Sequence, residues 1–351
     1  MPSFGGPGLI LVFLVAAAAT WIAGVYLSRA TDALDDRLQL GDALGGVVLL
    51  AVAGSLPELA ITVSAALQGS LDIAAGNLIG GIATQTLVLV LCDRAVRGDR
   101  PLTFLVGSLT PVVEALLVVA VSGVMLLGTM LPASDAIGPF SPASLGILVV
   151  WVAGIAILGR LRRPEALPGI VTVHGSPWRR RRDRHPKVTK PYAGRSTIGI
   201  AGIFGAASLV TLVAGVALER SGNGLADLAG INGVVFGATF LAAATALPEI
   251  SSGIAAVRLG DHQLAVADIF GGNAFQLCLF VLADLIAGRP VLPEAGPSNA
   301  WLGALGIVMT VVVAGGVIVR AQRRRAGLGI DSIVNIGVYT LGIVGLLSLA
   351  R

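Results

Sequence analysis

Ten apolar stretches, each close to the length of a membrane-spanning helix, constrain the fold of this chain more than any other feature. A helix rises 1.5 Å per residue, so about 20 apolar residues cross the hydrocarbon core of a bilayer. Lipid offers the backbone no hydrogen-bond partner, so only α-helices and closed barrels can span it. We therefore expect an all-α integral membrane protein with ten transmembrane helices, at residues 8–27, 43–67, 73–92, 102–130, 143–159, 196–218, 231–257, 263–287, 299–319 and 332–350.

Composition supports this class and argues against several others. The chain is 55% hydrophobic and only 13% charged, whereas soluble domains are about a quarter charged. All three His residues fall outside the apolar stretches, and the chain contains neither His-Glu-x-x-His nor Gly-x-Ser-x-Gly. An intramembrane enzyme is therefore not expected. No folded basic domain is apparent, so nucleic acid is not an expected partner.

The basic residues predict the orientation. Of the 24 Lys and Arg residues, only Arg220, Arg289 and Arg351 fall on the side that also carries both termini. The positive-inside rule then places both termini outside the cytoplasm, in the plasma (inner) membrane. The loop 160–195, which contains SPWRRRRDRHPKVTKPYAGR, becomes a cytoplasmic linker. Its cluster of positive charge is suited either to solvent or to contact with anionic lipid headgroups.

An internal repeat fixes the expected architecture. A shift of 191 residues aligns 53–93 with 244–284 without a gap, and fourteen of the 41 positions are identical. Each half contains five apolar stretches, an odd number, so the second half enters the membrane from the opposite side. We expect two five-helix inverted-topology repeats, residues 1–159 and 196–351, joined by the linker 160–195.

The most informative shared element is Leu-Pro-Glu. Proline removes a backbone donor and disrupts the preceding turn, so Pro57 and Pro248 should break helices within apolar stretches. Carbonyls released there can line a cavity or bind an ion. Glu58 and Glu249 are the only charges in their stretches, and an isolated charge at the bilayer centre costs about 2.5–3.5 kcal/mol. The alternative is a purely structural role, in which a glutamate stabilises a helix kink. The symmetric placement of Glu58 and Glu249 argues against it.

A second set of polar residues follows on the next helix of each half. Asn77, Gly81 and Gln85 are spaced by four and so share one helix face. Asp268, Gly272 and Gln276 repeat the pattern, and Asp268 adds a third acid that we expect at the site. The glycines can also be explained by close helix packing. Glu114, alone in its stretch, is a secondary candidate for a proton acceptor or a simple packing acid.

With these residues in view, the chain resembles the cation/calcium antiporter superfamily, which includes the sodium/calcium exchangers. The segments that carry the resemblance are AGSLPELAITVSAALQGSLDIAAGNLIGGIATQ and ATALPEISSGIAAVRLGDHQLAVADIFGGNAFQ. The resemblance implies that Glu58 and Glu249 are the central metal-binding glutamates. It also implies a ligand role for Ser55 and Thr245, with carbonyls near Ala51 and Ala242 beside them.

Several positions depart from the superfamily pattern. Gly54 and Ala246 replace hydroxyl residues next to Leu-Pro-Glu, and Gly81 and Gly272 replace serines on the following helices. Gln85 and Gln276 stand in place of Asn or Asp, and Asp268 in place of Asn. Calcium takes six to eight oxygens at about 2.3–2.6 Å, so the identity of the cation stays open.

The expected function is secondary-active antiport of calcium, or another cation, against sodium or protons. The expected site residues are Glu58, Glu249, Ser55, Thr245, Asp268, Asn77, Gln85 and Gln276, with inorganic cations as partners and no cofactor. The alternative is a membrane scaffold or sensor that keeps the fold after losing ion ligands. The sequence makes no prediction of oligomeric state.

Overall fold

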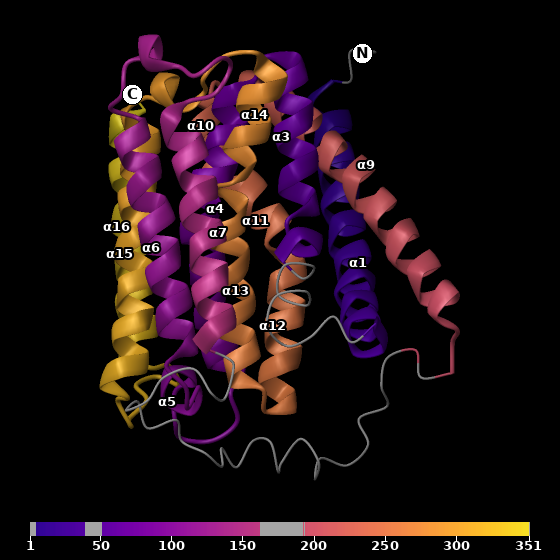
Figure 1. Cartoon of the computed structure of the whole chain (residues 1–351), viewed down its shortest axis with the longest axis vertical. Coiled ribbons are helices and arrows are strands. Elements are labelled where there is room, and N and C mark those ends of the chain that lie inside the picture. The colour runs from indigo at the N-terminus through magenta and orange to yellow at the C-terminus, as the bar shows by residue number, and fades with distance from the viewer. Residues whose placement is uncertain (1–4, 39–50, 162–191, 193, 351) are drawn as a thin grey trace.

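The computed structural model describes residues 5–38, 51–161, 192 and 194–350, and in these ranges the chain folds into a bundle of helices (Figure 1). Eight helical spans there are long and apolar enough to cross a membrane by length and composition. They are α1 (Gly6–Leu38), α4 (Leu71–Ala95), α6 (Thr110–Gly128), α7 (Pro142–Leu161), α9 (Thr197–Ala229), α13 (His262–Gln276) with α14 (Leu279–Ala287), α15 (Pro297–Val319) and α16 (Ile330–Leu349).

A ninth span is broken in the middle. Its first part comprises α10 (Gly233–Phe236), the π-helical η3 (Gly237–Leu241) and α11 (Ala242–Thr245), and its second part is α12 (Leu247–Leu259). The two parts meet at an angle of 45°. The remaining expected span, 43–67, lies partly outside the described residues; its second part is α3 (Leu56–Gln68). Short segments α5 (Leu102–Leu105), η2 (Ala133–Asp135) and η4 (Leu292–Glu294) occupy connections.

The helix breaks fall where the prolines predict them. Residues 51–54 are helical, Ser55 forms a turn, and α3 restarts with Pro57 in its first turn. Thr245 ends α11, Ala246 is the turn, and Pro248 lies in the first turn of α12. A proline at the beginning of a helix costs little, because the amide hydrogens there have no intrahelical acceptor. Glu58 and Glu249 therefore each lie in the first turn of a restarted helix.

The 191-residue repeat appears in the helix boundaries as well as in the sequence. Helices α3 and α12 each have 13 residues and are displaced by 191, and the first residues of α1 and α9, Gly6 and Thr197, are displaced by the same number. Helices α3 and α12 end alike, at Gly69 and Gly260, whose φ values of 77° and 84° place both in the left-handed region. The next helices begin at Leu71 and His262. The correspondence extends to α1 and α9, beyond the 41 positions aligned from sequence.

Helix α4 forms the centre of the bundle. Its span is 94% buried, whereas those of α1, α9 and α16 are 28%, 28% and 22% buried. The outer helices carry large exposed apolar side chains such as Leu11, Val213 and Leu341. Lipid-facing helices have this character, since apolar side chains there contact acyl chains. The structure thus supports an integral membrane protein whose most polar span is shielded from lipid.

Glycines on α4 allow the broken span to approach its backbone closely. A Cβ added at Gly76 would lie 2.5 Å from the carbonyl oxygen of Val234, and one at Gly80 would collide with Ala238. The close helix packing that the sequence allows at Gly81 is thus found at its neighbours Gly76 and Gly80, whereas Gly81 faces the Gln276 side chain.

Two buried aspartates join the halves of the chain. Asp93, near the end of α4, accepts hydrogen bonds through Oδ2 from the Gly329 amide (2.6 Å) and the Ser332 hydroxyl (2.8 Å), at the beginning of α16. Asp284, in α14, accepts through Oδ2 from the Ser141 amide (2.9 Å), just before α7. Asp93 and Asp284 are related by the 191-residue shift, as are Ser141 and Ser332. We call these two contacts the aspartate clamps.

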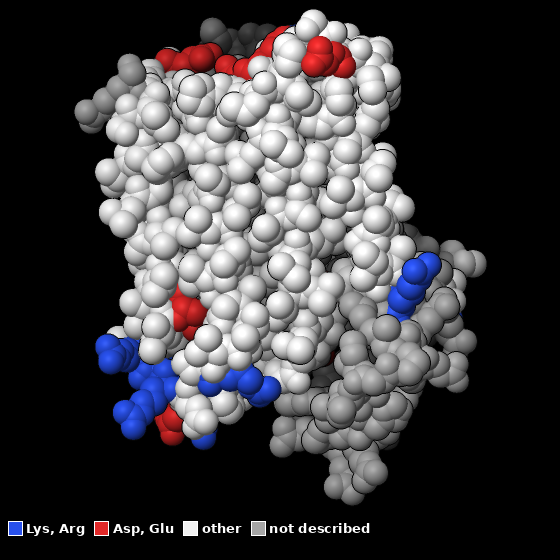
Figure 2. All heavy atoms as spheres, turned by 60° about the vertical axis from the view of Figure 1, so that its left-hand side comes forward, with Lys and Arg blue, Asp and Glu red and all other residues white. Residues whose placement is uncertain are grey.

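Charge is divided between the two ends of the bundle. We call the end that carries α14 in Figure 1 the upper end and the end that carries α5 the lower end. On the face shown in Figure 2, most Lys and Arg side chains lie toward the lower end, and acidic side chains dominate the upper end. Exposed Arg97, Arg100 and Arg323 contrast with exposed Asp72 and Asp135. Most of the linker 160–195, with its expected contact to lipid headgroups, lies outside the described residues.

Candidate functional site

Three carboxylates from three helices gather beside the helix breaks. Glu58 belongs to α3, Glu249 to α12 and Asp268 to α13, and Glu249 experiences electrostatic repulsion from both of the others. The structure therefore brings together the two glutamates that sequence placed in opposite halves. Among the described residues, no three His, Cys, Asp or Glu side chains already form a metal-binding group. A cation held here would need neutral oxygens to complete its shell.

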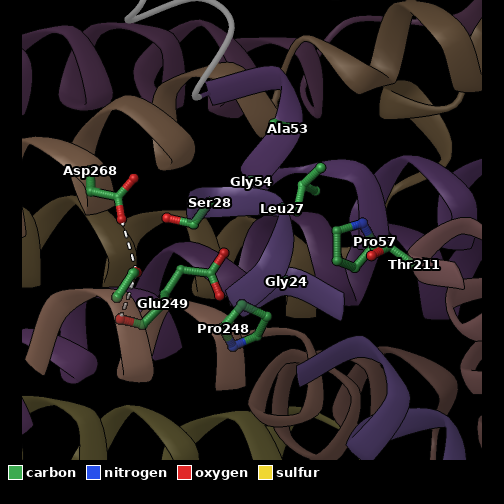
Figure 3. A pocket seen from close by; sticks show the side chains of 11 residues that line it. Gly24, Leu27, Ser28, Ala53, Gly54, Pro57, Thr211, Pro248, Glu249 and Asp268 are labelled. Carbon is green, nitrogen blue, oxygen red and sulfur yellow. Dashed lines mark hydrogen bonds between the residues drawn. The ribbon is translucent and has the colours of Figure 1, made fainter. Parts of the chain in front are cut away.

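Glu249 and Asp268 face a pocket of about 430 Å³, including its open mouth. Figure 3 shows the Glu249 carboxylate, the Asp268 carboxylate and the Ser28 hydroxyl directed toward a common space. Ser252 links two of these residues, because its hydroxyl lies 3.2 Å from Asp268 Oδ2 and 3.3 Å from the Glu249 carbonyl oxygen. The lining residues are Gly24, Leu27, Ser28, Ala53, Gly54, Pro57, Thr211, Pro248, Glu249, Ser252 and Asp268.

Glu58 lies deeper than Glu249 and outside the pocket lining. It is 1% exposed, and its Oε1 accepts a 3.3 Å hydrogen bond from Gln85 Nε2. The Thr245 hydroxyl, which donates to the Ala242 carbonyl at 3.2 Å, lies beside the same carboxylate. Oε2 of Glu58 and Oε2 of Glu249 have no donor at hydrogen-bonding geometry among the described residues. Buried carboxylate oxygens left in this state are suited to a cation or a proton.

The two glutamines reach across the repeat and fill the space left by glycine. A Cβ added at Gly81 would lie 3.1 Å from Gln276 Nε2, and one at Gly272 would lie 4.0 Å from Gln85 Oε1. Gln276 Nε2 also donates to the Leu78 carbonyl at 2.7 Å. Each glutamine thus faces the glycine of the other half.

The remaining expected residues lie nearby. Ser55 is 4% exposed at the first helix break, where its carbonyl accepts from the Leu59 amide and its amide donates to the Ala51 carbonyl. Ala246 donates in the same way to Ala242. Asn77 is 1% exposed on α4, with neither side-chain polar atom hydrogen-bonded within the described residues.

Two further positions complete the comparison with the sequence. Gly54 lines the pocket, and a Cβ there would meet nothing within 4 Å, so the missing hydroxyl leaves open space. Glu114 is buried on α6 and is not among the residues that line the pocket.

Sequence reasoning missed several residues near the site. Ser252 follows Glu249 by three positions, so a shared helix face could have revealed it. Ser28 and Thr211 line the pocket from the outer helices α1 and α9, where sequence carried no motif. Glu219 on α9 is 0% exposed and was overlooked because the apolar stretch was ended at Leu218, one residue before it.

The sequence and the fold both match those of known proteins. The sodium/calcium exchanger protein family matches residues 8–167 and 194–348. The putative antiporter CaxA of Alkalimonas amylolytica is 25% identical over 286 residues, covering 81% of each chain. The inner membrane protein YrbG of Escherichia coli (strain K12) is 24% identical over 251 residues, covering 72% of this chain and 69% of its own.

Solved structures share the fold. The H+/Ca2+ exchanger CAX matches with a TM-score of 0.66 and 13% identity, covering 97% of this chain and 87% of its own. The sodium-calcium exchanger NCX_Mj matches with a TM-score of 0.57 and 16% identity, covering 96% and 98%. The chain therefore belongs to the sodium/calcium exchanger protein family, a family of membrane cation exchangers that are secondary transporters and not enzymes.

Proposed function

We propose that this protein is a secondary-active antiporter that exchanges calcium, or another divalent cation, for protons or sodium by alternating access. The observation that carries the proposal is the meeting of Glu58 and Glu249. Each follows a proline-broken helix, the two positions are related by the 191-residue shift, and each keeps a buried oxygen without a hydrogen-bond donor among the described residues. Intramembrane acids placed in this way serve transport far more often than structure.

Exchange follows from the electrostatics of such a site. Two or three carboxylates can neutralise one divalent ion, or an equivalent number of protons or monovalent ions. Both sets together would leave excess positive charge, and cations a few ångströms apart repel by several kcal/mol at low dielectric. Loading of one substrate therefore expels the other.

The proposed architecture is ten transmembrane helices in two inverted five-helix repeats, residues 1–159 and 196–351. The equal lengths of α3 and α12, which are displaced by 191, and the same displacement between the first residues of α1 and α9 support this division. We place both termini outside the cytoplasm and the linker 160–195 inside. The gathering of Arg and Lys toward the lower end on the face in Figure 2 supports that orientation.

The donor set favours protons over sodium as the counter-ion. Gly54, Gly81 and Gly272 supply no hydroxyl oxygen with which to complete a sodium coordination shell. Three carboxylates can each take up a proton, and proton uptake needs no shell of neutral oxygens. The cation itself would be held by Glu58 and Glu249, with Asp268, Thr245 and the Gln85 amide as further candidates.

Exchange in reconstituted liposomes tests the proposal. Calcium flux driven by a proton gradient, and separately by a sodium gradient, is measured for the parent, Glu58→Gln and Glu249→Gln. Each substitution removes one of two charges that neutralise the ion, so we expect flux to fall about 100-fold or more. Glu294→Gln, a change of an exposed acid far from the pocket, is the matched control and should leave flux unaltered.

Loss of hydroxyl ligands also motivates the alternative of a non-transporting membrane scaffold or sensor. A protein that binds a cation in its folded state is stabilised by that cation. Calcium should therefore raise the unfolding temperature of the parent and leave that of Glu249→Gln unchanged. Unaltered flux in both glutamate variants would refute the site, and absence of both flux and cation stabilisation in the parent would favour the scaffold.

A further inference from the structure

The outer helices contact the broken helices in two equivalent places. Helix α1 lies on α12, where a Cβ added at Gly24 would be 2.6 Å from Pro248 Cβ. Helix α9 lies on α3, where a Cβ added at Gly215 would be 2.6 Å from Ala60 Cβ and 3.0 Å from the Pro57 carbonyl oxygen. Gly24 and Gly215 are related by the same 191-residue shift. The two crossings are therefore counterparts, one below the helix breaks and one above them.

The two crossings differ one turn beyond each glycine. On the upper crossing, Glu219 is fully buried and accepts three side-chain hydrogen bonds. Its Oε2 accepts from Ser64 Oγ (2.7 Å) and Gln68 Nε2 (2.6 Å), both on α3, and its Oε1 accepts from Ser70 Oγ (2.9 Å). We call these four residues the upper network. Within the described residues, no Lys or Arg forms an ion pair with Glu219, so these three donors are its polar partners.

The lower crossing has no equivalent of this network. The counterparts of Glu219, Ser64, Gln68 and Ser70 are Ser28, Ala255, Leu259 and Asp261, so the central carboxylate and two of its three donors are missing there. The pocket that exposes Glu249 and Asp268 opens at this crossing, and Ser28 lines it. Among the described residues, one crossing is thus joined by polar contacts, whereas its counterpart lines the pocket.

We propose that Glu219 is a positioning residue that holds α9 against α3 and so closes the upper route to the site while the lower route is open. This proposal rests on the proposed exchange function. When the upper route opens, α9 separates from α3, the three hydrogen bonds break, and water hydrates the carboxylate and its former donors. Charged hydrogen bonds of this kind are strong enough, three together, to decide which of two arrangements is populated.

The repeat also identifies which residues the upper route would expose. The pocket residues Ser252, Asp268 and Thr211 have as counterparts Ile61, Asn77 and Thr20. Both polar atoms of the Asn77 side chain and the Thr20 hydroxyl are buried without a partner among the described residues. Buried groups of that kind gain hydrogen bonds when water enters. The closed upper route therefore already contains polar groups that water would hydrate when the route opens.

Thiol labelling measures this closure directly. Ile61→Cys reports on the upper route and Gly54→Cys on the lower pocket, in a background where Cys92 and Cys278 are replaced by Ala. A membrane-impermeant maleimide is added from each side to vesicles of both orientations. In the parent, we expect slow labelling at Ile61→Cys and fast labelling at Gly54→Cys.

Glu219→Ala should reverse this bias. We expect labelling at Ile61→Cys to accelerate at least about tenfold and labelling at Gly54→Cys to slow, because the closed arrangement loses three charged hydrogen bonds. Ser70→Ala removes one of the three and should have a smaller effect in the same direction. Asp227→Ala, which removes an exposed carboxylate from the same helix, is the control and should match the parent.

Two results would overturn the proposal. One is fast labelling of Ile61→Cys in the parent, and the other is an unchanged rate in both Glu219→Ala and Ser70→Ala while their unfolding temperatures stay near the parent value. Labelling requires no transport. A shift in labelling without any cation exchange would therefore refute the exchange function and leave the closing role of Glu219 intact, and exchange without a shift would do the reverse.

Discussion

The crossing of α9 on α3 and the crossing of α1 on α12 share one backbone arrangement. They differ in that polar side chains join the first crossing, whereas the second lines the pocket. Both place a glycine against a proline-broken helix, at Gly215 and Gly24. Within the part of the chain that the structure describes, the upper crossing adds a buried carboxylate with three donors, and the lower crossing lines the pocket. A repeated backbone therefore supplies the two arrangements, and a few side chains decide which crossing is closed.

Placing the residues of the upper network at the equivalent positions of the lower crossing should have the largest effect on which crossing is closed. The change combines Ser28→Glu with Ala255→Ser, Leu259→Gln and Asp261→Ser, the last keeping a residue that can cap α13. A second set of charged hydrogen bonds should close the lower pocket and slow labelling of Gly54→Cys about tenfold. The control carries the same substitutions without Ser28→Glu. Equal labelling rates in the two proteins would contradict the role given to the carboxylate.

The glycine–glutamine pairs offer a second, smaller asymmetry. A Cβ at Gly81 would press on Gln276 at 3.1 Å, whereas one at Gly272 would stand 4.0 Å from Gln85. Gly81→Ser should therefore reduce cation flux several-fold and Gly272→Ser less. Shortening the partner, in Gly81→Ser with Gln276→Asn, should recover flux by relieving the contact. If the double variant were as slow as the single one, the pairing would not be the cause.

The smallest effect is expected at Gly54. An added Cβ meets nothing within 4 Å there, and alanine is favoured over glycine in a helical segment by about 0.5–1 kcal/mol. Gly54→Ala should raise the unfolding temperature slightly and leave flux within about twofold of the parent. Thr245→Ala is the informative comparison, because Thr245 is the 191-related counterpart and its hydroxyl lies beside Glu58. Equal effects of the two substitutions would mean that the halves contribute alike to the site.

Local rules were enough to predict the helix breaks and the acids that follow them. Pro57 and Pro248 must disturb a helix wherever it lies, so Glu58 and Glu249 could be placed from sequence alone. Nine of the ten expected spans contain helices of spanning length, counting the bent pair, within the part of the chain that the structure describes. The tenth, residues 43–67, is described only from residue 51 onward.

Features that depend on contacts between distant segments could not be predicted in this way. The face shared by Asn77, Gly81 and Gln85 was visible, but the pairing of Gly81 with Gln276 requires knowledge of how α4 and α13 cross. Glu219 was missed for a different reason. An apolar stretch is normally ended at its first charge, and here that charge lies inside the bundle, 0% exposed, because Ser64, Gln68 and Ser70 supply its hydrogen bonds.

The aspartate clamps have a consequence for how the polypeptide is assembled. Asp93 reaches the beginning of α16 and Asp284 reaches the beginning of α7, so each half supplies the anchor for the last helix of the other. Such reciprocity is the form of a two-fold contact between identical subunits, retained here within one chain. During synthesis, α7 emerges before residue 284 has been made, so the hydrogen bond from the Ser141 amide to Asp284 can form only after that residue is added.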